Sequence, residues 1–120
     1  MNKNDKLKMF WKIISRINKN FCNNKVKVNE IILFSKGDLD KSFPDRKGWY
    51  FSDKRFILIG SKENLKMQIE ILVHEFTHAY QHQILDYSGE RRGKHLKTDG
   101  EVYQRFLKST EDILTISLKH

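Results

Sequence analysis

The first hydrophobic pattern in the chain has the period of an α-helix. Between Asp5 and Phe21 the apolar residues recur three or four positions apart, with lysine and arginine between them; they are Leu7, Phe10, Trp11, Ile14, Ile17 and Phe21. This spacing is typical of an amphipathic helix that buries one face. Asn23 and Asn24 follow directly and are expected to end the helix.

The pattern then changes to that of a small sheet. From Val26 to Phe34 the sequence is rich in β-branched residues and alternates in part, as expected of a strand buried on at least one face. Two further short runs, 49–51 and 56–59, are separated by a polar stretch of hairpin length. The sequence therefore predicts about three strands, with a loop from Lys36 to Lys47 that holds the only proline.

A long helix is predicted from about Lys62 to about Leu85. Gly60 ends the preceding strand, Ser61 offers an N-cap hydroxyl, and Glu63 places a carboxylate near the positive helix end. One side of this helix carries Leu65, Ile69, Leu72, Phe76, Ala79 and Gln83, and nearly the opposite side carries Met67, Ile71, His74 and His78. A helix that is apolar on two sides belongs in the core.

The last part of the chain predicts a loop and a closing helix. Residues 86–97 are polar and contain two glycines, and Thr98 can cap a helix that continues through Phe106. A chain of 120 residues allows one domain with a core of its own. The predicted architecture is a single α+β domain over residues 1–120, with an N-terminal helix, a three-stranded sheet, a central helix and a C-terminal helix.

Cysteine content and hydropathy limit the kinds of metal site and the cellular locations that are expected for this chain. The single cysteine, Cys22, excludes an internal disulfide framework and a four-cysteine zinc ribbon, so any metal must be held by histidine and carboxylate. Cys22 itself is expected to be a small core residue. No apolar run approaches the ~18 residues that cross a bilayer, and we expect a cytoplasmic protein without membrane contact.

The charge balance is strongly basic. Lysine and arginine number 23 against 15 acidic residues, for a formal charge of +8. Such an excess favours contact with DNA or another polyanion. The basic residues are spread among many Asn and Ile residues, which fits a compositional bias equally well.

Residues 74–78 read His-Glu-Phe-Thr-His, an HExxH motif. Residues four apart on a helix project from one face, so His74 and His78 can bind one zinc ion. Glu75 is rotated by about 100° from His74, which is the position of a general base beside the metal. Because two imidazoles and a carboxylate are costly to bury unless something binds them, their place in a core helix favours a metal site. Peptide hydrolysis is the chemistry that this set suits.

A catalytic zinc usually takes three protein ligands, so one more must come from outside the helix. His95, 17 residues after His78, is the expected third ligand, and Asp99 and Glu101 are the alternatives. His82 is turned by about 80° from His74 and is expected outside the ligand set. Tyr80 and Tyr103 are expected to serve mainly in packing, although a phenol near zinc can also stabilise an oxyanion.

On these residues the chain resembles the SprT-like zinc metalloprotease domain, the family of Spartan and of small bacterial and phage members. The resemblance rests on the order of elements, the HExxH helix and the sequence His-Ala-Tyr-Gln at 78–81. It implies a minimal zincin-like domain in which His74 and His78 bind zinc and Glu75 is catalytic. It also implies a protein or peptide substrate, contact with DNA, and a cytoplasmic location, which would be the host cytoplasm if the protein is viral.

The resemblance leaves two placements for the third ligand. Family members carry a His-Gly-x-x-aromatic pattern at the start of the closing helix. By distance His95 takes the place of that histidine, followed here by Leu96; by pattern the segment 99–103 fits and places Asp99 there. A regulatory protease with Glu101 as the third ligand is a further hypothesis. The alternative to an enzyme is a basic nucleic-acid-binding accessory protein with a structural or inactive zinc site.

Overall fold

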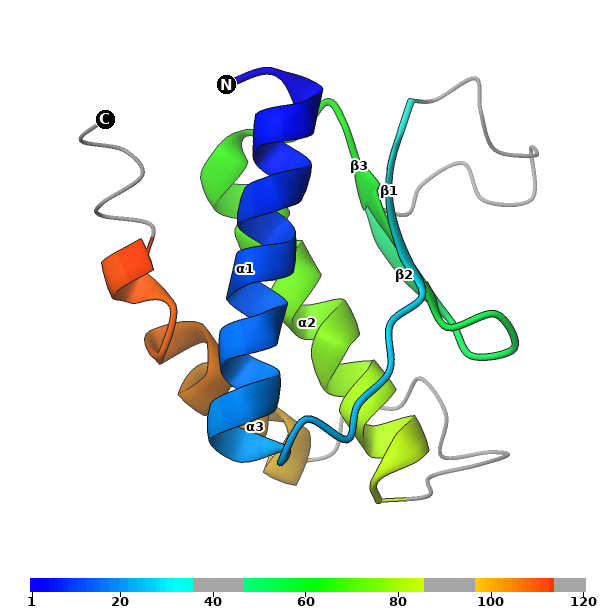
Figure 1. Cartoon of the computed structure of the whole chain (residues 1–120), viewed down its shortest axis with the longest axis vertical. Coiled ribbons are helices and arrows are strands. Elements are labelled where there is room, and N and C mark those ends of the chain that lie inside the picture. The colour runs from blue at the N-terminus through cyan, green and yellow to red at the C-terminus, as the bar shows by residue number, and fades with distance from the viewer. Residues whose placement is uncertain (36–46, 86–96, 114–120) are drawn as a thin grey trace.

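The computed structural model describes residues 1–35, 47–85 and 97–113, and it has the predicted α+β architecture. The elements follow in the order α1 (Lys3–Phe21), β1 (Glu30–Phe34), β2 (Gly48–Phe51), β3 (Phe56–Gly60), α2 (Leu65–Gln83) and α3 (Lys97–Lys108). Figure 1 shows α1 and α2 packed on one side of the sheet, with α3 beside the helices. The predicted loops 36–47 and 86–97 lie almost wholly outside the described residues.

Helix α1 confirms the periodicity read from the sequence. The Asn2 side chain accepts a hydrogen bond from the Asp5 backbone N–H over 2.8 Å and caps the first turn. Of the predicted stripe, Phe10, Ile14 and Ile17 are buried in the core. Trp11 and Phe21 are instead 37% and 39% exposed, and the buried face is completed by Met9 and Ile13. The helix ends where predicted because Asn23 and Asn24 both adopt a positive φ, a conformation that asparagine tolerates and a helix cannot continue through.

The sheet is mixed, with strand order β1-β3-β2. β1 runs parallel to β3, with Ile31 opposite Ile57, while β2 runs antiparallel to β3, with Tyr50 opposite Ile57. The alternate residues that face the helices belong to the hydrophobic core; they are Ile31, Leu33, Ile57 and Ile59. Of the three described strands, β2 therefore lies at one edge of the sheet, next to α2 (Figure 1).

The predicted strand from Val26 to Phe34 was too long at its start. Only Glu30–Phe34 is a strand, because two side-chain amides bind the backbone before it. Asn18 of α1 donates to the Val26 carbonyl (2.7 Å) and accepts from its N–H (3.1 Å). Gln83 of α2 makes the same pair of bonds with Lys27, each 2.7 Å long. These amides satisfy the backbone groups that a strand neighbour would otherwise bind.

The predicted bounds of the central helix also need correction. Asn64, not Ser61, is the N-cap, and its side chain accepts from the Met67 N–H over 2.8 Å. Ser61 is held in the turn after β3, where its N–H donates to the Phe34 carbonyl. At the other end the helix stops at Gln83, two residues before the predicted end. Helix α3 begins at Lys97, one residue before the predicted cap at Thr98.

No helix within the described ranges is both long enough and apolar enough to span a bilayer. The longest helices there, α1 and α2, have 19 residues each. Both carry charged or strongly polar side chains along their length, which is why neither qualifies.

Gly48 allows β2 to approach α2 closely. A Cβ built on Gly48 would lie 2.2 Å from Cγ2 of Ile71 and 3.2 Å from the Leu58 carbonyl oxygen. Isoleucine in a helix has little rotamer freedom with which to move aside. We therefore expect Gly48→Ala to lower the free energy of unfolding by about 1–3 kcal/mol, as overpacking does. Urea denaturation of the purified variant measures this loss.

Gly100 provides the matched control for that substitution. It lies in α3, and a Cβ built there meets no atom within 4 Å. Since alanine favours a helix over glycine, Gly100→Ala should raise the free energy of unfolding by about 0.5–1 kcal/mol. Equal stability of the Gly48→Ala protein and the wild type would show that the strand and the helix are not as close as described.

Candidate metal centre

The HExxH motif lies near the middle of α2, and its three polar side chains are held close together. One ligand atom from each of His74, Glu75 and His78 lies within 4.8 Å of the others. The helix is fixed in its rotation because Ile69, Leu72 and Phe76 are buried in the core. This leaves the two histidines half-buried and Glu75 only 6% exposed.

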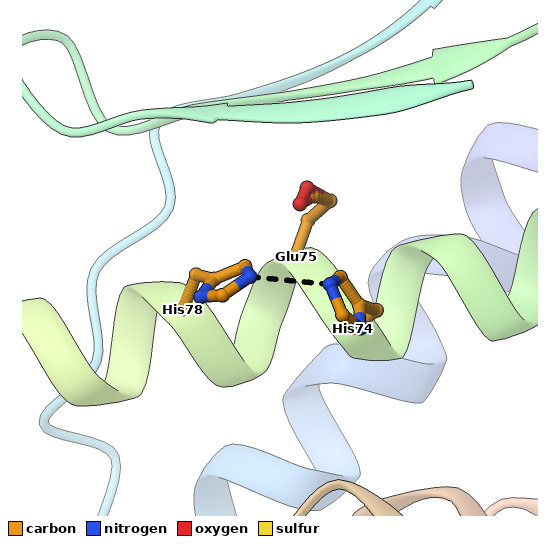
Figure 2. A group of neighbouring side chains, drawn as sticks. All are labelled: His74, Glu75 and His78. Carbon is orange, nitrogen blue, oxygen red and sulfur yellow. Dashed lines mark hydrogen bonds between the residues drawn. The ribbon is translucent and has the colours of Figure 1, made fainter. Parts of the chain in front are cut away.

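The two imidazole rings meet through their Nε2 atoms. These atoms are 3.1 Å apart, and the rings stand almost at right angles, with centroids 4.7 Å apart (Figure 2). Zinc binds imidazole nitrogen at about 2.0–2.1 Å, so two nitrogens at this separation are close enough to bind one ion. The hydrogen between the two Nε2 atoms would leave this position when both nitrogens bind a metal. The two residues therefore fit a zinc site.

Glu75 leaves the helix in a different direction from the histidines. In Figure 2 its side chain rises from α2 toward the strands, while the imidazoles meet on the adjoining side of the helix. A Cβ on Gly48 would lie 3.5 Å from Cγ of Glu75, which places the carboxylate stem beside the start of β2. A carboxylate between a strand and two candidate metal ligands is well placed to exchange protons with groups at a bound metal.

His78 has a partner on its other ring nitrogen. Its Nδ1 lies 3.0 Å from Oε1 of Gln81, one turn further along α2. An amide oxygen can only accept a hydrogen bond, so the hydrogen lies on Nδ1 of His78. The Nε2 atom consequently keeps a lone pair, which is the form that binds a metal. Gln81 is buried, with 6% of its surface exposed.

Helix α3 covers the other side of the motif. The Tyr103 ring stands edge-on to His74, with centroids 5.8 Å apart. Burial, and then the nearby Glu70 carboxylate, raise the pKa of the Tyr103 phenol, so the phenol stays protonated at neutral pH and can donate a hydrogen bond. Tyr80 instead packs edge-on against Phe106, with centroids 5.6 Å apart, as expected for a packing residue.

Of the three candidates for the third ligand, Glu101 is the one whose side chain is described. His95 lies outside the described residues, and so does the side chain of Asp99 in the first turn of α3. Glu101 is described; its side chain is exposed and does not belong to the cluster that His74, Glu75 and His78 form. His82 is likewise outside this cluster, as predicted, and its Nδ1 lies 3.2 Å from the Tyr50 hydroxyl.

Cys22 is a core residue, as the sequence predicted. It is buried after the end of α1, and burial raises the pKa of its thiol from 9.0 to about 11. Since the thiolate is the nucleophile, a thiol with this pKa is almost wholly unreactive at neutral pH. Cys22 therefore does not compete with the HExxH cluster as a reactive centre.

Two residues of the site had been given no role from the sequence. Gln81 is three residues after His78, a spacing that puts two side chains on neighbouring positions of one helix, and this signal was available. Gly48 is the first residue of the aromatic strand β2, and a glycine in a strand often marks a close approach of backbone. Which element it approaches depends on the tertiary fold, so the contact with Glu75 was beyond sequence reasoning.

Comparison of the chain with protein-family models, with curated proteins and with solved structures found no match.

Proposed function

We propose that the protein is a zinc metallopeptidase of the zincin type, similar to SprT-like proteases, that hydrolyses peptide bonds of protein substrates. The observation that carries this proposal is the 3.1 Å pair of Nε2 atoms of His74 and His78, with the Glu75 carboxylate beside it. His74 and His78 supply two zinc ligands. His95, Asp99 and Glu101 are the candidates for the third.

Each group at the site has a separate role in the proposed reaction. Zinc, when bound, supplies a Lewis acid that lowers the pKa of a water ligand toward ~7 and polarises the scissile carbonyl. Glu75 accepts the proton of the attacking water and passes it to the leaving amine. Tyr103, protonated and in contact with His74, is the candidate donor to the developing oxyanion.

The position of β2 suggests how a substrate would approach. Among the described strands, β2 lies at one edge of the sheet and runs antiparallel to β3, and its first residue, Gly48, lies beside Glu75. An extended peptide bound along such a strand uses its backbone hydrogen-bonding groups, and this recognition does not depend on sequence. Substrate backbone would then pass Glu75 and the two histidines. We expect unfolded or extended protein segments to be cleaved in preference to compact ones.

Metal removal tests the proposal directly. The zinc-loaded protein should cleave a fluorophore-labelled, unfolded protein substrate, and incubation with 1,10-phenanthroline followed by dialysis should abolish the cleavage. One equivalent of zinc should restore it, because the metal supplies the Lewis acid of the reaction. Cleavage that continued at the same rate in chelated protein, with zinc shown by mass spectrometry to be absent, would contradict a metallopeptidase.

A second candidate function, binding of nucleic acid by an accessory protein with a structural or inactive zinc, is favoured by the distribution of charge. The first 29 residues hold eight lysines and arginines and one acidic residue, and so carry +7 of the chain's +8. On α1 the exposed side chains of Lys8, Lys12 and Lys19 lie within about 40° of one another and span about 16 Å. Such a stripe suits contact with a phosphate backbone.

Charge reversal tests this second candidate. The triple variant Lys8→Glu, Lys12→Glu, Lys19→Glu should bind a fluorescein-labelled single-stranded oligonucleotide at least ~10-fold more weakly than the wild type at about 0.1 M salt, because phosphate contacts are lost. The matched control reverses three other exposed lysines, Lys54, Lys62 and Lys66. Equal losses in both variants would mean that only net charge matters and that α1 forms no binding surface.

A further inference from the structure

We infer that Gln81 is a positioning residue of the metal centre: its amide oxygen holds the hydrogen of His78 on Nδ1 and so presents the Nε2 lone pair to the metal. The inference rests on the proposed zinc site and adds a residue to it. Two independent observations support it. They are the hydrogen bond between the two side chains and the burial of the Gln81 amide, whose Nε2 has no acceptor among the described residues.

The hydrogen bond sets the chemical form of His78. A neutral imidazole carries its hydrogen on either nitrogen, and only the nitrogen without it can bind a metal. With Oε1 of Gln81 at 3.0 Å from Nδ1, the hydrogen is held on the side away from His74. The bond also fixes the rotation of the ring, because it and the contact with His74 lie at opposite ends of the imidazole. Partners of this kind are a regular part of metal centres.

Burial of Gln81 is hard to explain by stability alone. Its side chain is 6% exposed, and its Nε2 is a buried donor with no hydrogen-bond acceptor among the residues that the structure describes. A buried amide with an unmatched donor destabilises a fold, and leucine would fill a similar volume without that cost. The retained amide is explained if its oxygen serves His78.

Gln68, on the same helix, shows how a buried glutamine serves the fold instead. It is fully buried, and its Nε2 donates to the carbonyls of Gly60 and Ser61 at 3.2 and 3.3 Å, which ties α2 to the end of β3. Its Oε1, like Nε2 of Gln81, has no partner among the described residues, so the two glutamines differ in which group their bonded atom serves. Gln68 lies ten residues before His78 and has no bond to either motif histidine among the bonds described. It is therefore a matched control, because it is a buried glutamine on α2 whose loss should lower the stability of the fold without changing the affinity for zinc.

The test compares Gln81→Leu, Gln81→Glu and Gln68→Leu in the full chain. Zinc dissociation constants are measured by competition with a chromophoric chelator. We expect Gln81→Leu to bind zinc 10–100-fold more weakly than the wild type. Gln81→Glu, which keeps an acceptor oxygen at this position, should bind at least as tightly as the wild type. Gln68→Leu should lower the melting temperature and leave the dissociation constant within about twofold.

If Gln81→Leu does not fold well, a spectroscopic measurement on the wild type still tests which nitrogen of His78 carries the hydrogen. In ¹⁵N spectra of the zinc-loaded wild type, the His78 Nδ1–H should be visible and slow to exchange with water, since it is bonded to the buried Gln81. In Gln81→Ala it should exchange faster. Equal zinc affinity of the wild type and Gln81→Leu, or a His78 hydrogen on Nε2, would overturn the role of Gln81 while the zinc site stands. A wild type without stoichiometric zinc would overturn both.

Discussion

Replacement of Glu75 by glutamine should abolish peptide hydrolysis and leave zinc bound. The two side chains have nearly the same shape, so a residue that is 6% exposed beside Gly48 can be exchanged without a cavity or a clash. Glutamine cannot take up the proton of the attacking water. Loss of a general base costs about 10²–10⁴-fold in rate, so we expect kcat to fall at least ~100-fold. Cleavage of an unfolded, fluorophore-labelled protein measures the rate.

Two controls make this result specific. Zinc content of the Glu75→Gln protein, measured by mass spectrometry, should equal that of the wild type, because Glu75 is not assigned as a ligand. Glu63→Gln, which removes a carboxylate just before α2 and far from the motif in sequence, should keep the wild-type rate. Undiminished hydrolysis by Glu75→Gln would refute the role of Glu75 as general base, whereas a zinc-loaded wild type without any hydrolysis would favour the accessory-protein hypothesis.

The periodic elements of this fold were predictable because their signals are local. The stripe that includes Phe10, Ile14 and Ile17 predicted α1, and the paired asparagines after it predicted its end. The hairpin strands β2 and β3 were found from two short apolar runs around a polar turn. Each of these predictions depends on residues within about one helical turn or one hairpin of each other. Contacts with distant parts of the chain therefore changed the predicted elements little.

The boundaries that were wrong depend on contacts distant in sequence. Val26 and Lys27 have the composition of a strand, but their backbone groups are taken by the amides of Asn18 and Gln83, 8 and 56 residues away. Ser61 and Asn64 are both good N-cap residues, and the choice between them was made by the bond of Ser61 to β1. Sequence propensity cannot rank such alternatives, because the deciding partner is elsewhere in the fold.

Some features of the candidate site were likewise predictable from local sequence, and others depend on the tertiary fold. The closeness of His74 and His78 follows from the four-residue spacing on a helix, which is why the sequence could predict it. The place of Glu75 beside β2 depends on how Gly48 packs on the helix, and the contact of Tyr103 with His74 depends on how α3 docks. The expected third ligand would come from another segment, and no periodicity relates such a segment to α2.

Loss of either motif histidine should remove the metal. We expect His74→Ala and His78→Ala each to purify with less than about a tenth of the wild-type zinc, since one remaining imidazole and a third ligand hold the ion poorly. The wild type should also gain thermal stability when zinc is added, because a ligand that binds only the folded state stabilises it by mass action. Neither variant should show this gain. Zinc content by mass spectrometry and melting curves with and without zinc measure both effects.

A series of single variants in the same assay separates the zinc geometries. His82→Ala is the matched control, because His82 is one turn beyond His78 on α2 and bonds to Tyr50 instead; it should retain stoichiometric zinc. Among His95→Ala, Asp99→Ala and Glu101→Ala, the variant that loses zinc identifies the third ligand. Full zinc content in both His74→Ala and His78→Ala would refute a centre built on the motif, because two ligands that touch at 3.1 Å cannot both be dispensable to it.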